Sequence, residues 1–361
     1  MPDLASPPEA AAPASRGATR RRRNPLVPSF CLAYAVGVLA FFLVIRYAGD
    51  HWWPATILLY APRWPWLLPL FVLLPLTLHR RDKKWIWLTC FAGIFALGPL
   101  MGLAIPWRRL VQATTGEMTG EKLRVLVCNV HRAELNPPAL DAYIRQMQPQ
   151  VVLLQDYSPR DAGPAFSGPG WRHYQLGEIF IATRFPLKKV HDLHLERIPG
   201  PDDGDVSHRT GSAVCFDLET ASGPLHVVGL HLASPHPALR TLARNRIKAA
   251  MRLEANSTRR WRESQHISDW LATQTGPLII AGDFNTPADS AIYRQFWWKY
   301  PDAFPTAGFG FGYTHLSWLS EMRIDHLLTS QGITCTGFQT GPDCGTPHRP
   351  MVADLVIQSP R

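Results

Sequence analysis

Polar side chains that suit phosphate or metal chemistry stand at the ends of several short apolar runs of this 361-residue chain. Carboxylate and amide oxygens are hard ligands that divalent cations prefer, and imidazole changes its protonation state near neutral pH. If the apolar runs are strands of shared sheets, their ends can converge on one cleft. The residues in question are Asn129, Asp156, His231, Asp283, Asn285, Asp325 and His348.

The runs that must position these residues are short and rich in β-branched side chains, which is typical of buried strands. Helical spacing of apolar residues predicts two helical regions, Pro138–Met147 and Pro237–Thr273. Strands mixed with a few helices over residues 122–361 predict one α/β domain built of layered sheets. The expected strands are Leu123–Val130, Val151–Gln155, Ile179–Thr183, Ala213–Leu218, Leu225–His231, Leu278–Ala281, Ile324–Thr329 and Met351–Ile357.

Six motifs, in their order along this domain, resemble the endonuclease/exonuclease/phosphatase superfamily, the family of DNase I and of exonuclease III type nucleases. The motifs are Leu-Arg-Val-Leu-Val-Cys-Asn-Val at 123–130, Pro-Gln-Val-Val-Leu-Leu-Gln-Asp at 149–156, Gly-Leu-His-Leu at 229–232, Gly-Asp-Phe-Asn at 282–285, Arg-Ile-Asp-His at 323–326 and Pro-His-Arg-Pro-Met-Val-Ala-Asp-Leu at 347–355. The resemblance implies a DNase I-like four-layer α/β sandwich, with two packed mixed sheets flanked by helices. It also implies hydrolysis of a phosphoester by water held near a divalent cation, Mg²⁺ or alternatively Mn²⁺.

The resemblance assigns the metal to Asp156 and Asn129. Asp156 stands where the family usually carries a metal-binding Glu, and it is a hard oxygen ligand that is one methylene shorter. Each assignment has a plainer alternative, because a strand-end Asp or Asn can also close a turn through its own side chain.

The remaining site residues are matched to proton transfer and phosphate binding. Asp283 would orient or deprotonate the water, and Asn285, two positions further along an extended segment, would donate to a phosphate oxygen from the same face. An Asx turn is the alternative for this pair. His231 and His348 would bind phosphate or move protons, and Asp325 would orient a catalytic His, with His348 as the expected partner.

Two departures from the family pattern put the strength of catalysis in question. The family commonly has Asp directly before the final His, whereas this chain has Pro347, and Asp156 replaces a Glu. Asp343 could substitute in space for the missing carboxylate. A catalytically degenerate binding module that keeps the fold therefore stays open beside the enzyme.

Two further segments bear on the substrate. The Gly-rich aromatic loop Gly308–Thr314 could line a substrate pocket with Tyr313, or could pack its aromatic side chains into the core. A basic helical stretch could contact a polyanion or lipid headgroups, or could be a solvated helix face. Its members are Arg240, Arg244, Arg246, Lys248, Arg252, Arg259, Arg260 and Arg262.

The N-terminal third has the composition of a membrane anchor. Residues 1–27 are predicted to be a disordered basic tail, 28–109 an anchor with three transmembrane helices, and 110–121 a linker. The apolar runs are Phe30–Ile45, Trp64–Leu78 and Trp85–Trp107, and tryptophans flank them as in interfacial belts. The predicted partners are thus a lipid bilayer and a phosphodiester substrate, with no protein partner implied.

Charge is distributed unevenly between the two parts. Residues 1–120 carry 13 basic and 5 acidic side chains, a net +8 of the total +9, so the domain itself is close to neutral. Near-neutrality argues weakly against a nuclease groove and leaves a lipid headgroup, a small phosphodiester or a nucleic acid as substrate. The basic clusters at 20–23 and 79–84 predict a cytoplasmic tail and hinge, which puts the domain outside the cytoplasm. There, Cys335 and Cys344 could pair.

Overall fold

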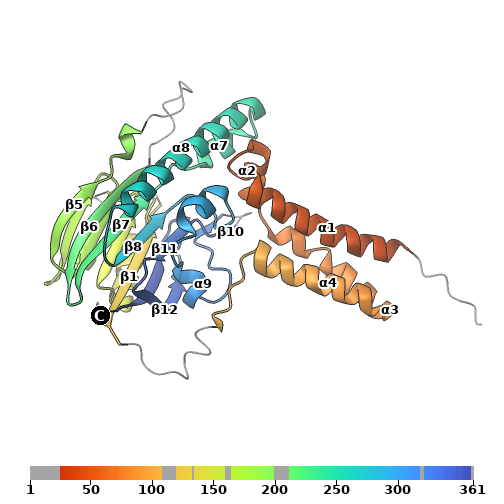
Figure 1. Ribbon diagram of the computed structural model, residues 1–361, viewed down its shortest axis with the longest axis horizontal. Coiled ribbons are helices and arrows are strands. Elements are labelled where there is room, and N and C mark those ends of the chain that lie inside the picture. Colours follow the sequence, from red (N-terminus) through yellow and green to blue (C-terminus); the bar gives the residue numbers. More distant parts are fainter. Residues whose placement is uncertain are drawn as a thin grey trace, which may run out of the picture.

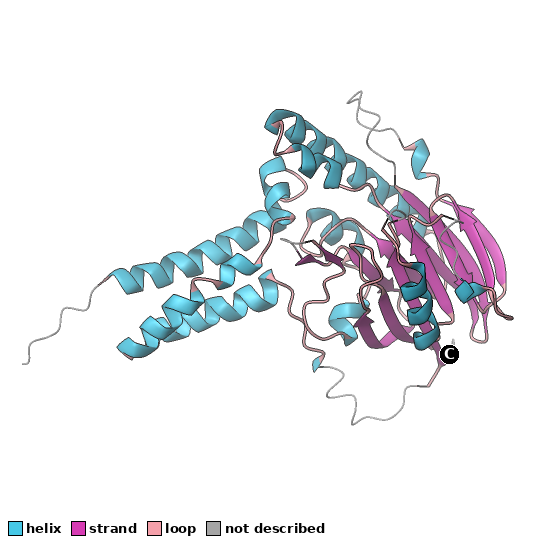
Figure 2. Cartoon of the chain, turned by 180° about the vertical axis from the view of Figure 1, so that it is seen from behind, coloured by secondary structure: helices cyan, strands magenta, loops and turns pink. Residues whose placement is uncertain are grey.

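The computed structural model describes residues 25–107, 119–131, 134–158, 164–198, 211–317 and 321–358 (Figure 1). The predicted tail and linker therefore lie almost wholly outside the described residues. Two parts are visible: a layered α/β domain, and a bundle of N-terminal helices that projects away from it (Figures 1 and 2).

The first sheet has six strands in the order β12-β13-β1-β2-β4-β3. It is mixed, because β1 and β2 run parallel while the other neighbours are antiparallel. Its strands are β1 (Glu121–Asn129), β2 (Val151–Gln155), β3 (Arg172–Leu176), β4 (Ile179–Thr183), β12 (Ile333–Thr340) and β13 (Met351–Ile357).

The second sheet has five strands in the order β11-β8-β7-β6-β5, with β7 and β8 parallel. A separate two-stranded ribbon joins β9 (His315–Leu316) to β10 (Glu321–Met322). The strands of the second sheet are β5 (Leu187–Asp192), β6 (Ser212–Thr220), β7 (Gly223–His231), β8 (Leu278–Asp283) and β11 (Asp325–Thr329).

The two sheets pack face to face, and helices cover their outer faces. Val127, Leu153, Val227 and Ile279 belong to the apolar core between the sheets. Helix α8 (Arg246–Ala272) covers the second sheet, and α6 (Pro137–Met147) covers the first. Burial on both faces removes large apolar areas from water, which is the main stabilising term of such a sandwich. The predicted four-layer α/β sandwich is confirmed.

Every predicted strand is present, but β3, β5, β12 and the short ribbon strands β9 and β10 were not predicted. Strands β3, β5 and β12 lie at sheet edges, are partly exposed and carry several polar side chains, so they lack the continuous apolar run of a buried strand. The predicted helical region 237–273 is two helices, α7 (His236–Thr241) and α8. Asn245 separates them, because its side chain caps α8 by accepting the Lys248 N–H at 2.9 Å.

The N-terminal helices form a bundle with its own apolar core, which includes Cys31, Val38, Leu73 and Ala92. Helices α1, α3 and α4 lie side by side, while α2 lies where the bundle meets the domain (Figures 1 and 2). A short helix, Ala303–Ala307 (α9), lies in the α/β domain. The bundle helices are α1 (Leu26–Tyr47), α2 (Trp53–Leu59), α3 (Leu70–Arg80) and α4 (Lys83–Phe95).

The prediction of three spanning helices is not supported by the helix lengths. Among the described residues, one helix, Leu26–Tyr47, is long and apolar enough to cross a membrane. A second span exists only if Trp53–Leu59 and Trp64–Arg80, which meet at 72°, count as one. The third run forms the 13-residue α4 and a five-residue π-helical turn, because Pro99 interrupts the α-helical hydrogen bonding there. The described cysteines, Cys335 and Cys344 among them, are all free thiols.

A buried polar joint connects the bundle to the domain. The Arg260 side chain, fully buried on α8, donates to Asp50 Oδ1 at 3.0 Å and to the Tyr60 hydroxyl at 2.6 Å. The Tyr60 hydroxyl in turn donates to the Asn285 carbonyl at 2.8 Å. Arg63 also forms an ion pair with Asp289. The bundle thus contacts the loop that follows β8.

Candidate active site

The topology brings the polar strand ends to one edge of the sandwich. His231 and Asp283 are partners at the ends of the parallel strands β7 and β8. Asp283 is also the register partner of Asp325, which begins the antiparallel strand β11. Asn129 closes β1 beside the end of β2. Residues far apart in the sequence are therefore neighbours because the strand register fixes them.

Asp283 is the centre of the cluster and is almost completely buried. Its Oδ2 accepts a hydrogen bond from Asn129 Nδ2 at 2.9 Å. The Nε2 atoms of His231 and His348 lie 3.7 Å and 3.8 Å from the same oxygen. One carboxylate oxygen thus faces an amide and two imidazoles.

Asp325 and His348 form a buried carboxylate–imidazole pair. The distance from His348 Nδ1 to Asp325 Oδ2 is 2.9 Å, so the nitrogen donates its hydrogen and the ring orientation is fixed. The Thr314 hydroxyl oxygen accepts the Asp325 N–H at 3.1 Å, which ties β11 to the loop before β9. This pairing leaves His348 Nε2 directed toward Asp283.

Burial and the neighbouring charges separate the proton affinities of these groups. Burial, together with the Asp325 charge, raises the pKa of Asp283. Burial also disfavours the Asp325 carboxylate, but His348 outweighs it and lowers the pKa of Asp325. Burial lowers the pKa of His348, but the carboxylates of Asp325 and Asp283 outweigh burial, so the pKa is raised. The pair is therefore held as an ion pair next to a carboxyl group with raised proton affinity.

His231 is held by a carboxylate that the sequence did not indicate. Its Nδ1 lies 3.0 Å from Glu178 Oε1. Burial lowers the pKa of His231, but Glu178, Asp283 and Asp156 outweigh burial and raise it to about 9. His231 is thus an imidazolium at neutral pH. Glu178 precedes β4 in a tight turn, and nothing in the spacing of apolar residues distinguishes it from a surface turn residue.

The expected geometry of Asn285 is wrong. The chain does not stay extended after Asp283, because Asn285 adopts the left-handed conformation with φ of 46°. Its N–H donates to Asp283 Oδ1 at 2.7 Å, and its Nδ2 donates to the Leu232 carbonyl at 2.8 Å. The Asx turn considered as the alternative forms here, inside the cluster, and holds the Asp283 carboxylate.

Three further residues from the sequence analysis, Asp156, Tyr313 and Asp343, differ in how they relate to this cluster. Asp156 is buried after β2, with a left-handed φ of 50°, and acts electrostatically on His231. Tyr313 instead faces the bundle: its hydroxyl donates to the Met101 carbonyl at 3.5 Å and its ring stacks on Phe311. Asp343 pairs with Arg349 at 2.7 Å on the surface, so it does not replace the carboxylate that Pro347 lacks.

His315 is a second neighbour that sequence reasoning missed. Its ring lies 4.9 Å from that of His348, and burial with the His348 charge lowers the pKa of His315 to about 4. It is therefore a neutral imidazole beside a charged one. It stands in the short strand β9, which carries too few residues for a recognisable pattern.

A hard divalent cation fits the donor set at this edge. One carboxylate oxygen of Asp283 and one of Asp325 lie within 4.8 Å of each other. Asp156 and Asn129, the predicted holders, lie at the adjoining ends of β1 and β2 and offer a carboxylate and an amide oxygen. Oxygen donors of these two kinds are those that Mg²⁺ and Mn²⁺ prefer.

The model of the Endonuclease/Exonuclease/phosphatase family matches residues 126–348. The chain belongs to this family. The match runs from β1 to the buried His348 and so includes all the strand ends that form the cluster. Family membership supports a phosphoester hydrolase, and acidic and histidine residues that could hold a metal are present.

Solved structures of similar fold include TDP2 of D. rerio complexed with single strand DNA product, at 15% identity and a TM-score of 0.49. That match covers 65% of this chain and 99% of the other. The 3′ phosphatase NExo from Neisseria, bound to product DNA hairpin, is 16% identical over 64% and 98% of the chains, with a TM-score of 0.45. A family protein from Beutenbergia cavernae is 16% identical over 66% and 72%, with a TM-score of 0.48. No curated protein matches.

Proposed function

We propose that this family member is a membrane-tethered, divalent-metal-dependent phosphoester hydrolase of the phosphodiesterase or endonuclease type. The observation that carries the proposal is the buried cluster around Asp283, in which an amide, two imidazoles and a second carboxylate converge. Buried charges are costly unless they are paired or bind a cation, so clusters of this kind mark functional sites.

In this proposal, Asp156 and Asn129 hold Mg²⁺, or alternatively Mn²⁺. When bound there, such a cation would supply positive charge to the phosphate oxygens and would lower the pKa of a water molecule. Asn129 also orients Asp283 through its Nδ2, so the same side chain serves the metal and the carboxylate.

Asp283 orients the attacking water and accepts its proton. Burial and the Asp325 charge raise its proton affinity, as a general base near neutral pH requires. The imidazolium of His348, oriented by Asp325, donates to the phosphate or to the leaving oxygen. The imidazolium of His231, held by Glu178, donates to a phosphate oxygen. Both cations offset the negative charge that develops in the transition state.

Asn285 and Tyr313 serve the substrate in different ways. Asn285 holds the catalytic carboxylate by its backbone N–H and so would act on the substrate through Asp283. Tyr313 lies in the loop before β9, where it would line the approach to the site from the bundle side.

The proposed domain organisation follows the two parts of the structure. Residues 28–109 tether the protein to a bilayer, 110–121 link the parts, and 122–361 form the catalytic domain. Helix α1 has 22 residues, about 33 Å at 1.5 Å per residue, which matches the hydrocarbon thickness. The turn between α3 and α4, at Arg81, lies at the same end of the bundle as the start of α1 (Figure 1). With that basic end in the cytoplasm, the domain is extracytoplasmic.

The test is turnover by the full chain in detergent, because the buried Arg260–Asp50 joint makes the domain part of a larger fold. The substrates are bis-para-nitrophenyl phosphate, plasmid DNA and a phospholipid panel, each with Mg²⁺, Mn²⁺ or EDTA. Asp283→Asn should lower kcat by about 10²–10⁴-fold. Asp269→Asn, an exposed carboxylate on α8, is the matched control and should leave turnover unchanged.

The second candidate is a catalytically degenerate binding module. It is favoured by Pro347, which offers no carboxylate, and by the position of Asp343 on Arg349 rather than in the cluster. Metal-dependent turnover that is lost in Asp283→Asn supports the enzyme. Folded protein without turnover on any substrate, both as it stands and with Pro347→Asp, supports the module.

A further inference from the structure

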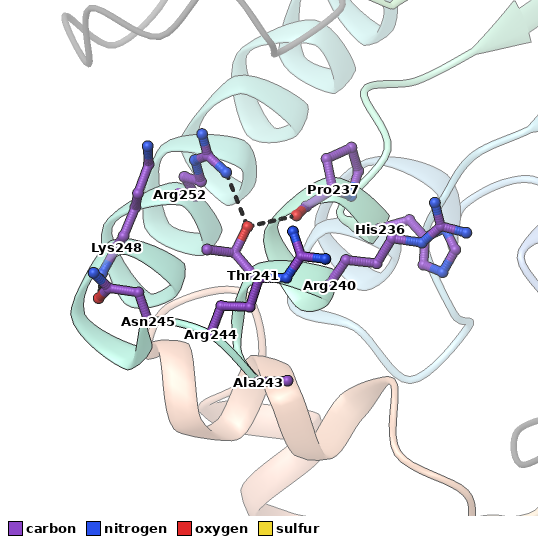
Figure 3. A pocket seen from close by; sticks show the side chains of 9 residues that line it. All are labelled: His236, Pro237, Arg240, Thr241, Ala243, Arg244, Asn245, Lys248 and Arg252. Carbon is purple, nitrogen blue, oxygen red and sulfur yellow. Dashed lines mark hydrogen bonds between the residues drawn. The ribbon is translucent and has the colours of Figure 1, made fainter.

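A strongly basic pocket lies beside the candidate active site, on the turn between α7 and α8. It has a volume of about 900 Å³. Figure 3 shows the side chains that line it. None of the described residues that line it carries a carboxylate. The lining residues are His236, Pro237, Arg240, Thr241, Ala243, Arg244, Asn245, Lys248 and Arg252.

The frame of this pocket is ordered by hydrogen bonds. The Thr241 hydroxyl donates to the Pro237 carbonyl at 3.0 Å and accepts from Arg252 Nη1 at 2.9 Å (Figure 3). Arg240 and Arg244 extend from the same side of the turn and are exposed (Figure 3). Arg240 and Arg244 thus place two exposed cationic side chains at one cavity, next to Lys248 and Arg252. Such an arrangement gains stability when an anion binds.

The pocket lies where the bundle meets the domain. Leu239, on the same short helix as Arg240, packs against the apolar core of the bundle. The exposed aromatic residues at the domain end of the bundle are Tyr47, Trp52 and Trp64, the kinds of side chain that occupy the membrane–water interface. With the bundle in a bilayer, the pocket is therefore at the level of the lipid headgroups.

Exposed apolar side chains accompany the basic ones. Ile247 is 75% exposed and Met251 is 58% exposed, and both are on the first two turns of α8 beside Lys248. A cationic surface with large unpaired apolar groups matches a membrane interface, where the apolar groups enter the acyl boundary. A nucleic-acid groove would be expected to pair its cations with large stacking aromatic side chains instead, and no Phe, Tyr or Trp is among the residues that line this pocket.

A row of imidazoles connects the pocket to the catalytic cluster. The His236 ring, at the pocket wall, lies 6.3 Å from that of His315, which lies 4.9 Å from that of His348. An anion in the pocket is therefore separated from the phosphate-binding groups by two side chains.

We propose that this pocket binds the headgroup of an anionic phospholipid of the bilayer and so holds that bilayer surface against the active site. The proposal rests on the proposed membrane attachment and adds a binding site distinct from the catalytic cluster. Arg240 and Arg244 supply the exposed contacts to the headgroup phosphate, and Ile247 and Met251 rest against the lipid.

The test measures lipid binding and needs no turnover. Native mass spectrometry of the full chain in zwitterionic detergent measures its affinity for phosphatidylglycerol and for phosphatidylcholine with the same acyl chains. The double variant Arg240→Gln/Arg244→Gln should lose about 30-fold in phosphatidylglycerol affinity, since each charge near an anionic headgroup contributes about fivefold. The control Lys188→Gln/Lys189→Gln removes two exposed charges from the distant strand β5 and should leave affinity unchanged.

Four results would overturn the proposal. These are equal affinity for the two lipids, no loss in the Arg240/Arg244 variant, an equal loss in the control, and full displacement of lipid by millimolar inorganic phosphate. Displacement by a single-stranded oligonucleotide whose binding depends on Arg240 would identify a nucleic-acid site instead. Turnover of bis-para-nitrophenyl phosphate is measured in parallel, and it should be the same in the variant and the unmodified chain. If the unmodified chain shows no turnover but still prefers phosphatidylglycerol to phosphatidylcholine, only the proposed hydrolase activity is refuted.

Discussion

Replacing Arg260 with methionine tests whether the bundle and the catalytic domain form one cooperative structure. The guanidinium is 0% exposed and pairs with Asp50, which belongs to the bundle. It also donates to the Asn285 carbonyl at 3.1 Å and to the Thr286 hydroxyl at 3.1 Å. Methionine keeps the volume and removes every one of these donors.

The cost follows from what the substitution leaves behind. Asp50 stays buried without its cation, and the loss of one member of a buried pair typically costs about 3–5 kcal/mol. Each kcal/mol lowers the Tm of a domain of this size by about 2–4 °C, so the expected fall is roughly 6–20 °C. Replacing both members, Arg260→Met with Asp50→Leu, should cost less than Arg260→Met alone, because no unpaired charge remains.

The assay is thermal unfolding of the full chain in detergent, followed by tryptophan fluorescence. Arg262→Met, an exposed position two residues along the same helix, is the control and should stay within about 0.5 kcal/mol of the unmodified chain. Hydrogen exchange at residues 283–286 should rise in Arg260→Met, because the carbonyl of that turn loses its donor. A Tm within about 2 °C of the unmodified chain would refute the structural role assigned to the joint.

Two further predictions concern buried carboxylates. Asp325→Asn should lower the pKa of His348, because the Asp325 charge is the main factor that raises it, and kcat should fall by about 10²-fold or more. Histidine NMR titration of the metal-free chain measures the shift, and an unchanged His348 titration would contradict the assigned pairing. Asp302 is buried against Arg323 at 2.5 Å and His326 at 3.3 Å; burial opposes ionisation, but these partners outweigh it and hold the pKa of Asp302 far below its usual range. Its stabilising contribution is therefore fully present above about pH 4 and is lost as the pH falls toward the lowered value. Asp302→Asn should accordingly lower the free energy of unfolding at pH 7, and that free energy should fall less steeply between about pH 5 and pH 2 than in the unmodified chain. Denaturant unfolding at several pH values measures both effects. An equal or steeper fall in the variant would contradict the role assigned to Asp302.

The strands that carry the catalytic cluster could be predicted because a strand that is buried on both faces consists of consecutive apolar residues. Strands β2, β4 and β8 are buried at every position, and each was predicted within two residues. Strands β3, β5 and β12 have one face in water or lie at an edge, so their sequences resemble loops. The break between α7 and α8 escaped prediction because an Asn cap is a single residue inside a helical pattern.

The family, the four-layer architecture and most of the candidate site residues could be predicted from the sequence, since the motifs stand at the ends of buried runs in the order typical of the family. The geometry among those residues depended on tertiary structure. Strand register placed Asp325 opposite Asp283, and loop packing set His348 on Asp325. The roles of Glu178 and His315, the turn at Asn285 and the joint at Arg260 also required the fold. Each arises from contacts between segments that are distant along the chain, and such contacts leave no periodic pattern that a single sequence can carry.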